Sequence, residues 1–321
     1  MPIDLTAIVP TIGRSSLLED CLRRLRAEGG QDLEIVVVAQ GGNHSKDLQN
    51  LVDRVDVLPE NLGFTGGCNH VLARVDRKFV ALVNDDLLVE PGWMSLLLET
   101  IRRDPSLAAV QGLNLQLERP DLVDGFGIGW NRFWRPVQLG HGAAKPQTPR
   151  LSAEVFGTSA TAAIYRTEAL RAAALGPGEV FDSRLESYYE DVDLAIRLRQ
   201  KGWEARSIPS ARALHAGGGS SRDRAASLQR LAFSNRLLVS ARLFGRSFWR
   251  VLPLLLLRDV VEIAAGIARL RASEVGGSVG GWLRAIRLFG HFGHLGASTL
   301  PIEELERFRV GSAATALSRE P

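Results

Sequence analysis

The first 110 residues alternate short apolar, β-branched runs with segments of helical period, and this alternation leaves few folds open. The apolar runs are LTAIVP (5–10), LEIVVVA (33–39), VDVLP (55–59) and KFVALVNDD (78–86). The helical patterns that follow them are SLLEDCLRRLRA (16–27), SKDLQNLVDR (45–54), CNHVLARV (68–75) and GWMSLLLETIRR (92–103). Continuous apolar strands separated by helices are typical of a parallel sheet covered on both faces. The sequence therefore predicts an α/β protein with a mostly parallel central sheet flanked by helices.

The pattern changes after residue 110, where strands become shorter and glycine more frequent, and again after residue 222, where arginine-rich helical patterns begin. We expect an α/β domain at 1–222, made of halves 1–110 and 111–222. A helical, basic-amphipathic extension is expected at 223–300, and a partly disordered tail at 301–321.

The fourth apolar run, Phe79–Val83, ends abruptly in Asn84, Asp85 and Asp86. In open parallel sheets, ligands bind at the carboxyl ends of the strands, so these side chains are expected at the ligand-binding edge. Two adjacent acids repel each other unless a cation lies nearby. Hard oxygen ligands at a strand end suit Mg²⁺ or Mn²⁺. The alternative is a polar turn that leads into the next helix.

The turn ENLGFTGGCNH (60–70) lies at the same expected edge. Gly63, Gly66 and Gly67 would let the backbone approach a ligand closely, and the following helix would offer its amide end to an anion. A strand-to-helix turn without a ligand is the alternative. The glycine spacing is not that of a dinucleotide-binding fingerprint.

The segment ESYYEDVDLAIRLRQKGW (186–203) predicts a helix that opens with three carboxylates in four positions. Acidic residues in a first turn complement the positive end of the helix dipole, which accounts for Glu190 and Asp193. At 100° per residue the apolar side chains cover one broad arc, and Glu190, Asp193 and Arg197 lie opposite it. Asp191 points into the apolar arc. Because an inward carboxylate needs a partner, a ligand or a proton to take, Asp191 is a candidate for chemistry.

His215 ends a strand-like stretch and precedes three glycines, about one αβ unit after this helix. A lone histidine is more often structural than catalytic. Here the chain is expected to return to the edge that carries the carboxylates, where a histidine could complete a Mg²⁺ or Mn²⁺ shell.

The segment 122–142 interleaves Trp130 and Trp134 with Arg132 and Arg135. An irregular hairpin that packs its aromatic side chains inward is one interpretation. A wall of a pocket for a sugar or phosphate is the other, and the sequence leaves both open.

Charge is distributed unevenly along the chain. Residues 222–321 carry 15 Arg against 8 Asp and Glu, a net charge of +7, whereas the rest of the chain is at −4. A basic segment favours an anionic partner, either lipid or nucleic acid. No helix-turn-helix, zinc-finger or RNA-binding signature accompanies it, so we expect no nucleic acid partner.

Within residues 228–272, eight arginines are spread among Phe, Trp and Leu, and the longest uncharged run, Val251–Leu257, is too short to span a bilayer. Basic, aromatic-rich helices of this kind are typical of membrane-surface contact, here through 230–271. A subdomain packed on the core and a homodimer contact are the alternatives, and they stay open.

Two features bear on the compartment. Cys21 and Cys68 lack metal-ligand spacing and are predicted to be small buried residues of a reducing environment. The N-terminus MPIDLTAIVPTIGR has no basic region before its first apolar run, so we expect no signal peptide and a cytoplasmic location.

Taken in order, seven stretches make up a recognisable series: AIVPTIGR, LEIVVVAQGG, ENLGFTGGCNHVL, ALVNDDLLVEPGWM, GTSATAAIYRTEAL, FDSRLESYYEDVDLAIRLRQKGW and IPSARALHAGGGSS. The series covers about residues 3–222 and resembles the family 2 glycosyltransferases, particularly the bacterial rhamnosyltransferase-like branch. NDD followed by EDVDLAIR and then HAGGG is specific as a set. The resemblance implies the GT-A fold, a Rossmann-like nucleotide-binding half joined to an acceptor half around one sheet.

The resemblance also implies an inverting, metal-dependent transfer of a sugar from a nucleoside-diphosphate donor to a hydroxyl of a glycan or polyprenyl-linked acceptor. Asp86 would be the main ligand of Mg²⁺ or Mn²⁺, with Asp85 beside it and His215 as a further ligand. Asp191, in the family's ED motif, would be the general base. The metal would neutralise charge on the leaving diphosphate while the base takes the hydroxyl proton.

The residues expected on the donor side are Pro10, Thr11, Arg14, Gln40, Asn61, Gly63, Gly66, Asn69 and Asn84. Those expected on the acceptor side are Trp130, Trp134 and Glu190. The setting implied is cell-surface polysaccharide synthesis, in the cytoplasm and peripherally at the inner face of the cell membrane.

The chain departs from the family pattern at the end of the second strand, where Ala39 and Gln40 replace the common Asp and Asn. Gln40 can donate to and accept from a base edge, so the identity of the base stays open. Two other functions are considered. A sugar-1-phosphate nucleotidyltransferase would need a stronger triphosphate-holding signature than PTIGRSS, and a non-catalytic nucleotide-sugar-binding protein would be compatible with the departure.

Overall fold

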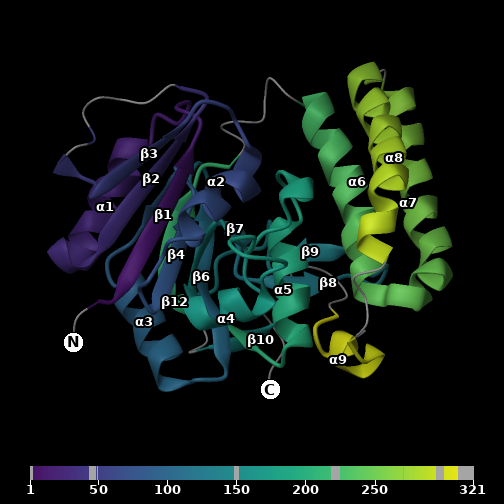
Figure 1. Ribbon diagram of the computed structural model, residues 1–321. Coiled ribbons are helices and arrows are strands. Elements are labelled where there is room, and N and C mark those ends of the chain that lie inside the picture. Colours follow the sequence, from purple (N-terminus) through teal and green to yellow (C-terminus); the bar gives the residue numbers. More distant parts are fainter. Residues whose placement is uncertain are drawn as a thin grey trace.

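The computed structural model describes residues 3–42, 48, 50–147, 152–217, 225–269, 271–293 and 300–309 (Figure 1). In these residues a ten-stranded sheet has the order β10-β12-β6-β11-β4-β1-β2-β3, with β5 paired to β12 and β7 paired to β6. The predicted α/β class with a mostly parallel central sheet and a C-terminal helical region is confirmed.

The first half follows the predicted alternation. Its strands are β1 (Leu5–Thr11), β2 (Glu34–Gln40), β3 (Arg54–Leu58) and β4 (Phe79–Val83), and its helices are α1 (Leu18–Gly29), α2 (Gly63–Leu72) and α3 (Trp93–Arg103). The four strands pair in parallel in the order β3-β2-β1-β4. The helix expected over 45–54 lies partly outside the described residues, and residues 50–53 form no α-helix before β3 begins.

The second half extends the same sheet through an antiparallel strand. Its elements are β5 (Leu87–Val89), β6 (Leu107–Gln116), β7 (Val123–Gly125), β10 (Ala153–Val155), β11 (Ala162–Arg166), α4 (Thr167–Ala173), α5 (Glu190–Gln200) and β12 (Glu204–His215). Strand β11 lies antiparallel between β4 and β6, and β12 pairs in parallel with β6. The segment 122–142 includes a hairpin of β8 (Ile128–Trp130) and β9 (Pro136–Gln138).

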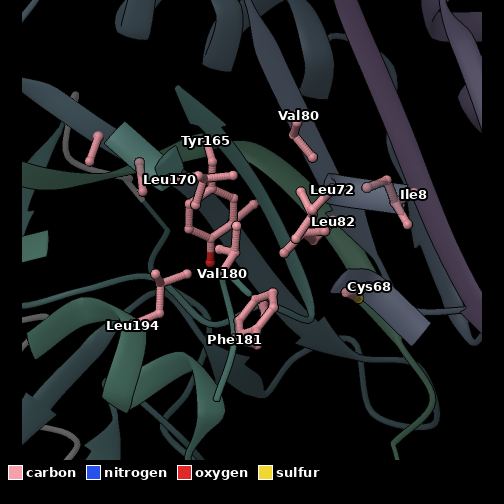
Figure 2. Close-up of a cluster of buried hydrophobic side chains, with 14 of the residues drawn as sticks. Ile8, Cys68, Leu72, Val80, Leu82, Tyr165, Leu170, Val180, Phe181 and Leu194 are labelled. Atoms are coloured by element: carbon pink, nitrogen blue, oxygen red, sulfur yellow. The ribbon is translucent and has the colours of Figure 1, made fainter. Parts of the chain in front are cut away.

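Two layers of apolar side chains hold the sheet between helices. On one face, α2, α4 and α5 contribute Leu72, Leu170 and Leu194 to a cluster that also holds Tyr165 and Phe181, as Figure 2 shows. On the other face, α1 and α3 pack against β1, β2 and β4. Both cysteines are buried, as predicted, and neither forms a disulfide.

Three long helices lie beside the α/β part, at the right of Figure 1: α6 (Ala225–Phe244), α7 (Phe248–Ala268) and α8 (Ala272–Gly293). Helices α6 and α8 approach so closely at Gly277 that a Cβ on this residue would lie 2.5 Å from Ala226 O. A short helix, α9 (Ile302–Arg307), with Leu305 and Phe308 buried, occupies part of the tail expected to be partly disordered. Residues 310–321 of that tail lie outside the described residues.

Helix α5 differs from its helical-wheel prediction. Its expected outer side is covered, and Asp193 and Arg197 are buried. Arg197 Nε donates to Asp193 Oδ2 at 2.9 Å, and Arg242 of α6 pairs with Asp193 and with Asp182. The wheel assigned one core to α5, whereas α6 supplies a second packing surface. Asp191 is the acidic residue of the first turn that stays partly exposed.

Candidate active site

A cavity of 640 Å³ opens at the carboxyl ends of β1, β2 and β4 and reaches the start of α5. Thr11 contributes from β1, Gln40 from β2 and Asn84–Asp86 from the turn after β4, while Asp191 and His215 line the same cavity. Parallel strands end at one edge of a sheet, which is where ligands bind in this architecture. The volume is within the range of small-ligand pockets.

Asp85 ties the ends of β1 and β4 together. Thr11 Oγ1 donates a short hydrogen bond to Asp85 Oδ2, and Ser15 Oγ donates to Asp85 O at 2.9 Å. Burial raises the pKa of Asp85 to about 6, against the opposing effect of the Thr11 hydrogen bond. One oxygen of this carboxylate is therefore already engaged by the protein.

Asp86 and His215 line the cavity, and a chain of contacts leads from Asp86 through His215 to Asp124. His215 Nε2 lies 3.3 Å from Asp86 Oδ1, and His215 Nδ1 lies 2.9 Å from Asp124 Oδ2. Burial acts to lower the pKa of His215, but the hydrogen bonds to Asp124 and Asp86 outweigh it and raise the pKa to about 9. Asp124 in β7 thus fixes the ring with Nε2 towards Asp86, as a carboxylate behind a metal-bound histidine does.

The donor set of Asp86 and His215 fits one divalent cation. Ligand distances of about 2.1 Å bring neighbouring ligands of one ion to a spacing like that of Asp86 Oδ1 and His215 Nε2. In the described part of the chain, no group of three or more His, Cys, Asp or Glu side chains forms a metal cluster. Mg²⁺ is usually held by one or two carboxylates together with substrate phosphates and water. The chain can therefore supply two ligands of such an ion. Substrate phosphate oxygens and water would supply the others.

Asp191 presents its carboxylate to the cavity from the first turn of α5. Asp191 Oδ1 accepts a hydrogen bond from Val192 N at 2.8 Å. Burial raises the pKa of Asp191, although hydrogen bonds with Val192 N, Ser159 and Ala160 N oppose the shift. A carboxylate with a raised pKa, open to a ligand cavity, is suited to accept a proton.

Glu190 lies beside it, buried but still at the cavity wall. Burial, and then the charge of Asp191, raises the pKa of Glu190 to about 8. Glu190 Oε2 has no hydrogen-bond partner among the described residues. Burial and the charge of its neighbour thus favour the protonated form of Glu190.

The cavity brings together most of the residues predicted from the sequence. Those that line it are Pro10, Thr11, Arg14, Gln40, Asn61, Gly63, Asn84, Asp85, Asp86, Glu190, Asp191 and His215. Four predicted residues are not among the lining residues: Gly66, Asn69, Trp130 and Trp134.

Asn69 and Gly66 serve the packing of α2 instead of the cavity. Asn69 Nδ2 donates to Phe181 O at 2.7 Å, and Asn69 Oδ1 accepts from Phe181 N at 2.9 Å. A Cβ on Gly66 would lie 2.5 Å from Leu62 Cβ, so glycine is needed for the close turn. Neither residue lines the cavity, and the donor-binding role expected of them stays a prediction.

Trp130 and Trp134 belong to a buried cluster between the hairpin and the C-terminal helices. The Trp130 ring meets Phe156 edge-to-face with centroids 5.0 Å apart, and Trp134 meets Phe244 at 5.8 Å. The inward-packing interpretation of 122–142 describes both side chains, and the acceptor-side role expected of them stays a prediction.

Gln40 lines the cavity with its amide already engaged. Gln40 Nε2 donates to Gly63 O at 3.2 Å, and Gln40 Oε1 accepts from Leu62 N at 2.9 Å. Both ends of the amide hold the turn before α2. A contact between Gln40 and a nucleotide base would have to replace or share these bonds.

Several residues of the cavity and its support carry no signal in the sequence. Asp124 stands alone in a glycine-rich run and carries no motif signal, and Ser159 bonds Asp191 from a loop. Leu228 and Ala232 line the cavity from α6, which the amphipathic pattern of 223–300 assigned to the extension alone. These contacts join segments that are far apart in the chain, so no local sequence pattern predicts them.

Comparison with known proteins places this geometry in context. The family model "Glycosyl transferase family 2" matches residues 6–172, which include Asp86 but end before Asp191 and His215. A search of curated proteins found no matching sequence.

Among the solved structures that are similar to this chain, two are described. One is GalNAc-T7 with UDP, GalNAc and Mn²⁺, with a TM-score of 0.58 and 13% identity over 75% of this chain and 48% of that chain. The other is the mannosyltransferase PcManGT from Pyrobaculum calidifontis in complex with GDP-Man and Mn²⁺, with a TM-score of 0.50 and 16% identity over 92% of this chain and 84% of that one. The chain thus spans about half the length of the first. At these identities the likeness shows a shared GT-A fold.

Proposed function

The chain belongs to glycosyl transferase family 2, and we propose that it transfers a sugar from a nucleoside-diphosphate donor to an acceptor hydroxyl, using Mg²⁺ or Mn²⁺. One observation carries the proposal. The pair Asp86–His215, which fits a cation, and the carboxylate of Asp191 line a single cavity of 640 Å³. Such a cavity has the size for a sugar bound between a diphosphate and a general base.

In this mechanism Asp191 takes the proton of the acceptor hydroxyl as its oxygen attacks the anomeric carbon. The bond from that carbon to the diphosphate oxygen breaks, and the nucleoside diphosphate leaves with the electron pair. Attack from the face opposite the leaving group inverts the anomeric centre. The raised pKa of Asp191 makes its carboxylate a better base, and the pKa of its neighbour Glu190 is raised as well, by burial and by the charge of Asp191.

Asp86 and His215 would hold the divalent ion, which when bound neutralises negative charge on the diphosphate. Asp124 keeps the His215 ring oriented through its contact with Nδ1. Pro10, Thr11 and Asn84 would form the donor side, at the strand ends. Tyr188, Leu228 and Ala232 also line the cavity, and we assign them to the acceptor side.

The function is tested by following the product formed from each candidate donor. UDP-, GDP- and dTDP-sugars, including a rhamnosyl donor, are incubated with the protein and Mn²⁺, with and without glycan or polyprenyl-linked acceptors. We expect slow release of nucleoside diphosphate from one donor, accelerated by its acceptor. Pyrophosphate release from a nucleoside triphosphate and a sugar 1-phosphate would instead support a nucleotidyltransferase. Binding without turnover of any donor would support a non-catalytic protein.

We further propose that the C-terminal helices contact an anionic membrane surface, where a polyprenyl-linked acceptor of cell-surface polysaccharide synthesis would be located. Trp249 and Leu257 on α7 and Ile286 on α8 are more than 60% exposed. Residues 225–293 contain ten Arg against three Asp and Glu, of which Asp259 is buried against Arg236. None of the described helices is both long and apolar enough to cross a bilayer. An interfacial contact combines exposed apolar side chains with arginines.

Sedimentation with vesicles containing about 30% phosphatidylglycerol tests this contact. The wild type should sediment with these vesicles. It should sediment less at high salt, because salt screens the attraction between the arginines and the anionic lipid. The double variant Trp249→Ser, Ile286→Ser should lose most of its binding, whereas Val57→Ser, which removes a half-exposed side chain on β3, should not. Concentration-dependent dimers without vesicle binding would instead assign this face to a homodimer.

A further inference from the structure

The four residues before the ED helix adopt a conformation that their side chains disfavour. Glu186, Tyr188 and Tyr189 have φ of 61°, 68° and 66°, in the left-handed region that glycine usually occupies. Three such residues within four positions persist only where the surroundings fix them. Ser187, Tyr188 and Tyr189 line the cavity, and Glu190 and Asp191 follow at once. The conformation of this segment, 186–189, therefore determines where the carboxylate of Asp191 lies.

The C-terminal helices hold the segment from one side. Asn235 of α6 is fully buried, and its Nδ2 donates to Leu185 O at 2.7 Å and to Ser187 O and Tyr188 O at 2.9 Å. Arg284 of α8 fixes the orientation of that amide, because its Nη1 donates to Asn235 Oδ1 at 2.7 Å. Arg284 Nη2 also donates to Glu186 Oε1 at 3.0 Å. One side chain of α6 therefore donates to three carbonyls in and next to this segment.

The donor half holds the same segment from the other side. Thr65 N donates to Glu186 O at 3.1 Å, and Phe64 N donates to Ser187 Oγ at 3.3 Å, both from the first turn of α2. A Cβ on Gly63 would lie 2.5 Å from Glu186 O, so the two backbones are in direct contact. The segment is therefore enclosed between the donor-binding turn and the C-terminal helices.

We propose that Asn235 and Arg284 are positioning residues: they hold segment 186–189 against α2 and so aim the Asp191 carboxylate at the acceptor hydroxyl over the bound donor. The inference rests on the proposed function. It makes the C-terminal helices, which lie beyond the matched family region, part of the catalytic apparatus, whatever surface they contact on their outer side. Neither residue touches the reacting atoms.

The test uses an isosteric exchange. Asn235→Asp replaces the shared donor by oxygens that face three carbonyls, while Arg284 can still pair with the new carboxylate. We expect kcat to fall by about 10- to 100-fold, because misplacing a catalytic group by about 1 Å has effects of this size. The dissociation constant of the donor should stay within about twofold, and the acid limb of the kcat–pH profile, due to Asp191, should move. Gln229→Glu is the matched control, since this α6 amide bonds only Ser278 of α8 at 3.3 Å among the described residues.

Hydrogen exchange provides a readout independent of turnover. Amides within 186–193, including Asp193 N bonded to Tyr189 O at 2.9 Å, should exchange faster in Asn235→Asp than in the wild type or Gln229→Glu. If Asn235→Asp fails to fold, Arg284→Lys is measured in the same assays. Unchanged exchange, or a folded variant with the control's kcat and pH profile, overturns the inference. If the wild type shows no turnover but the variant exchanges faster, the proposed function is refuted. The role of Asn235 and Arg284 in holding segment 186–189 is then still supported.

Discussion

Asp191→Asn should slow sugar transfer by about 10²- to 10⁴-fold, the range that a positioned general base contributes. The amide is isosteric and can still accept the hydrogen bond that Val192 N donates at 2.8 Å, so α5 keeps its first turn. It cannot take a proton from the acceptor hydroxyl. Steady-state transfer of the donor identified by the product assay provides the measurement.

The wild type should show the matching pH dependence. Burial raises the pKa of Asp191 above its ordinary value, and the base acts only when deprotonated, so kcat should fall as the pH is lowered through that raised pKa. This acid limb should be absent from the residual rate of Asp191→Asn. The control Asp20→Asn removes an exposed carboxylate on α1 and should behave as the wild type. A residual kcat within about threefold of the wild type would assign the base elsewhere.

Asp86→Ala should remove the effect of Mn²⁺ on donor binding. Mutating the partner behind a metal ligand typically lowers metal affinity about 10–100-fold, so losing the ligand should have at least the larger effect. The His215 Nε2 would keep its orientation through Asp124 but lose the carboxylate 3.3 Å away. Activity titrated with Mn²⁺ provides the measurement.

Asp124→Asn should have an effect on Mn²⁺ dependence that is smaller than that of Asp86→Ala. The Asn oxygen can still accept from His215 Nδ1, but the charge behind the ring is gone, so the Mn²⁺ concentration for half-maximal activity should rise less than in Asp86→Ala. Equal Mn²⁺ titration curves for Asp86→Ala and the wild type would show that the cation, if required, binds elsewhere.

The sequence was sufficient to predict the parallel part of the sheet and the edge at which distant side chains come together. Runs such as Phe79–Val83 identify buried parallel strands, and the rule that their carboxyl ends share one edge predicts Asp86 and His215 at that edge. The helical wheel of α5 singled out Asp191, and all three residues line one cavity. These are local patterns combined with a topological regularity. They do not depend on details of side-chain packing.

The helical wheel of α5 succeeded only in part. It singled out Asp191, which lines the cavity, but it assigned Asp193 to an outer face that α6 covers through Arg242. A wheel describes one core and cannot foresee a second surface from a segment 49 residues away. The same applies to Asp124 and Asn235, whose partners His215 and Leu185 are distant in the chain. Gln40 and Asn69 show the reverse case. Both were expected to bind the donor, but the Gln40 amide accepts from Leu62 N and the Asn69 amide donates to Phe181 O.

Calorimetric titration of the donor's nucleoside diphosphate, with and without Mn²⁺, into the wild type, Asp86→Ala and Asp191→Asn tests the central claim directly. If one end of the cavity holds the cation and diphosphate and the other holds the base, the wild type and Asp191→Asn should show the same Mn²⁺-dependent affinity, and Asp86→Ala should lose it. Equal loss in both variants, or none in Asp86→Ala, would contradict the account.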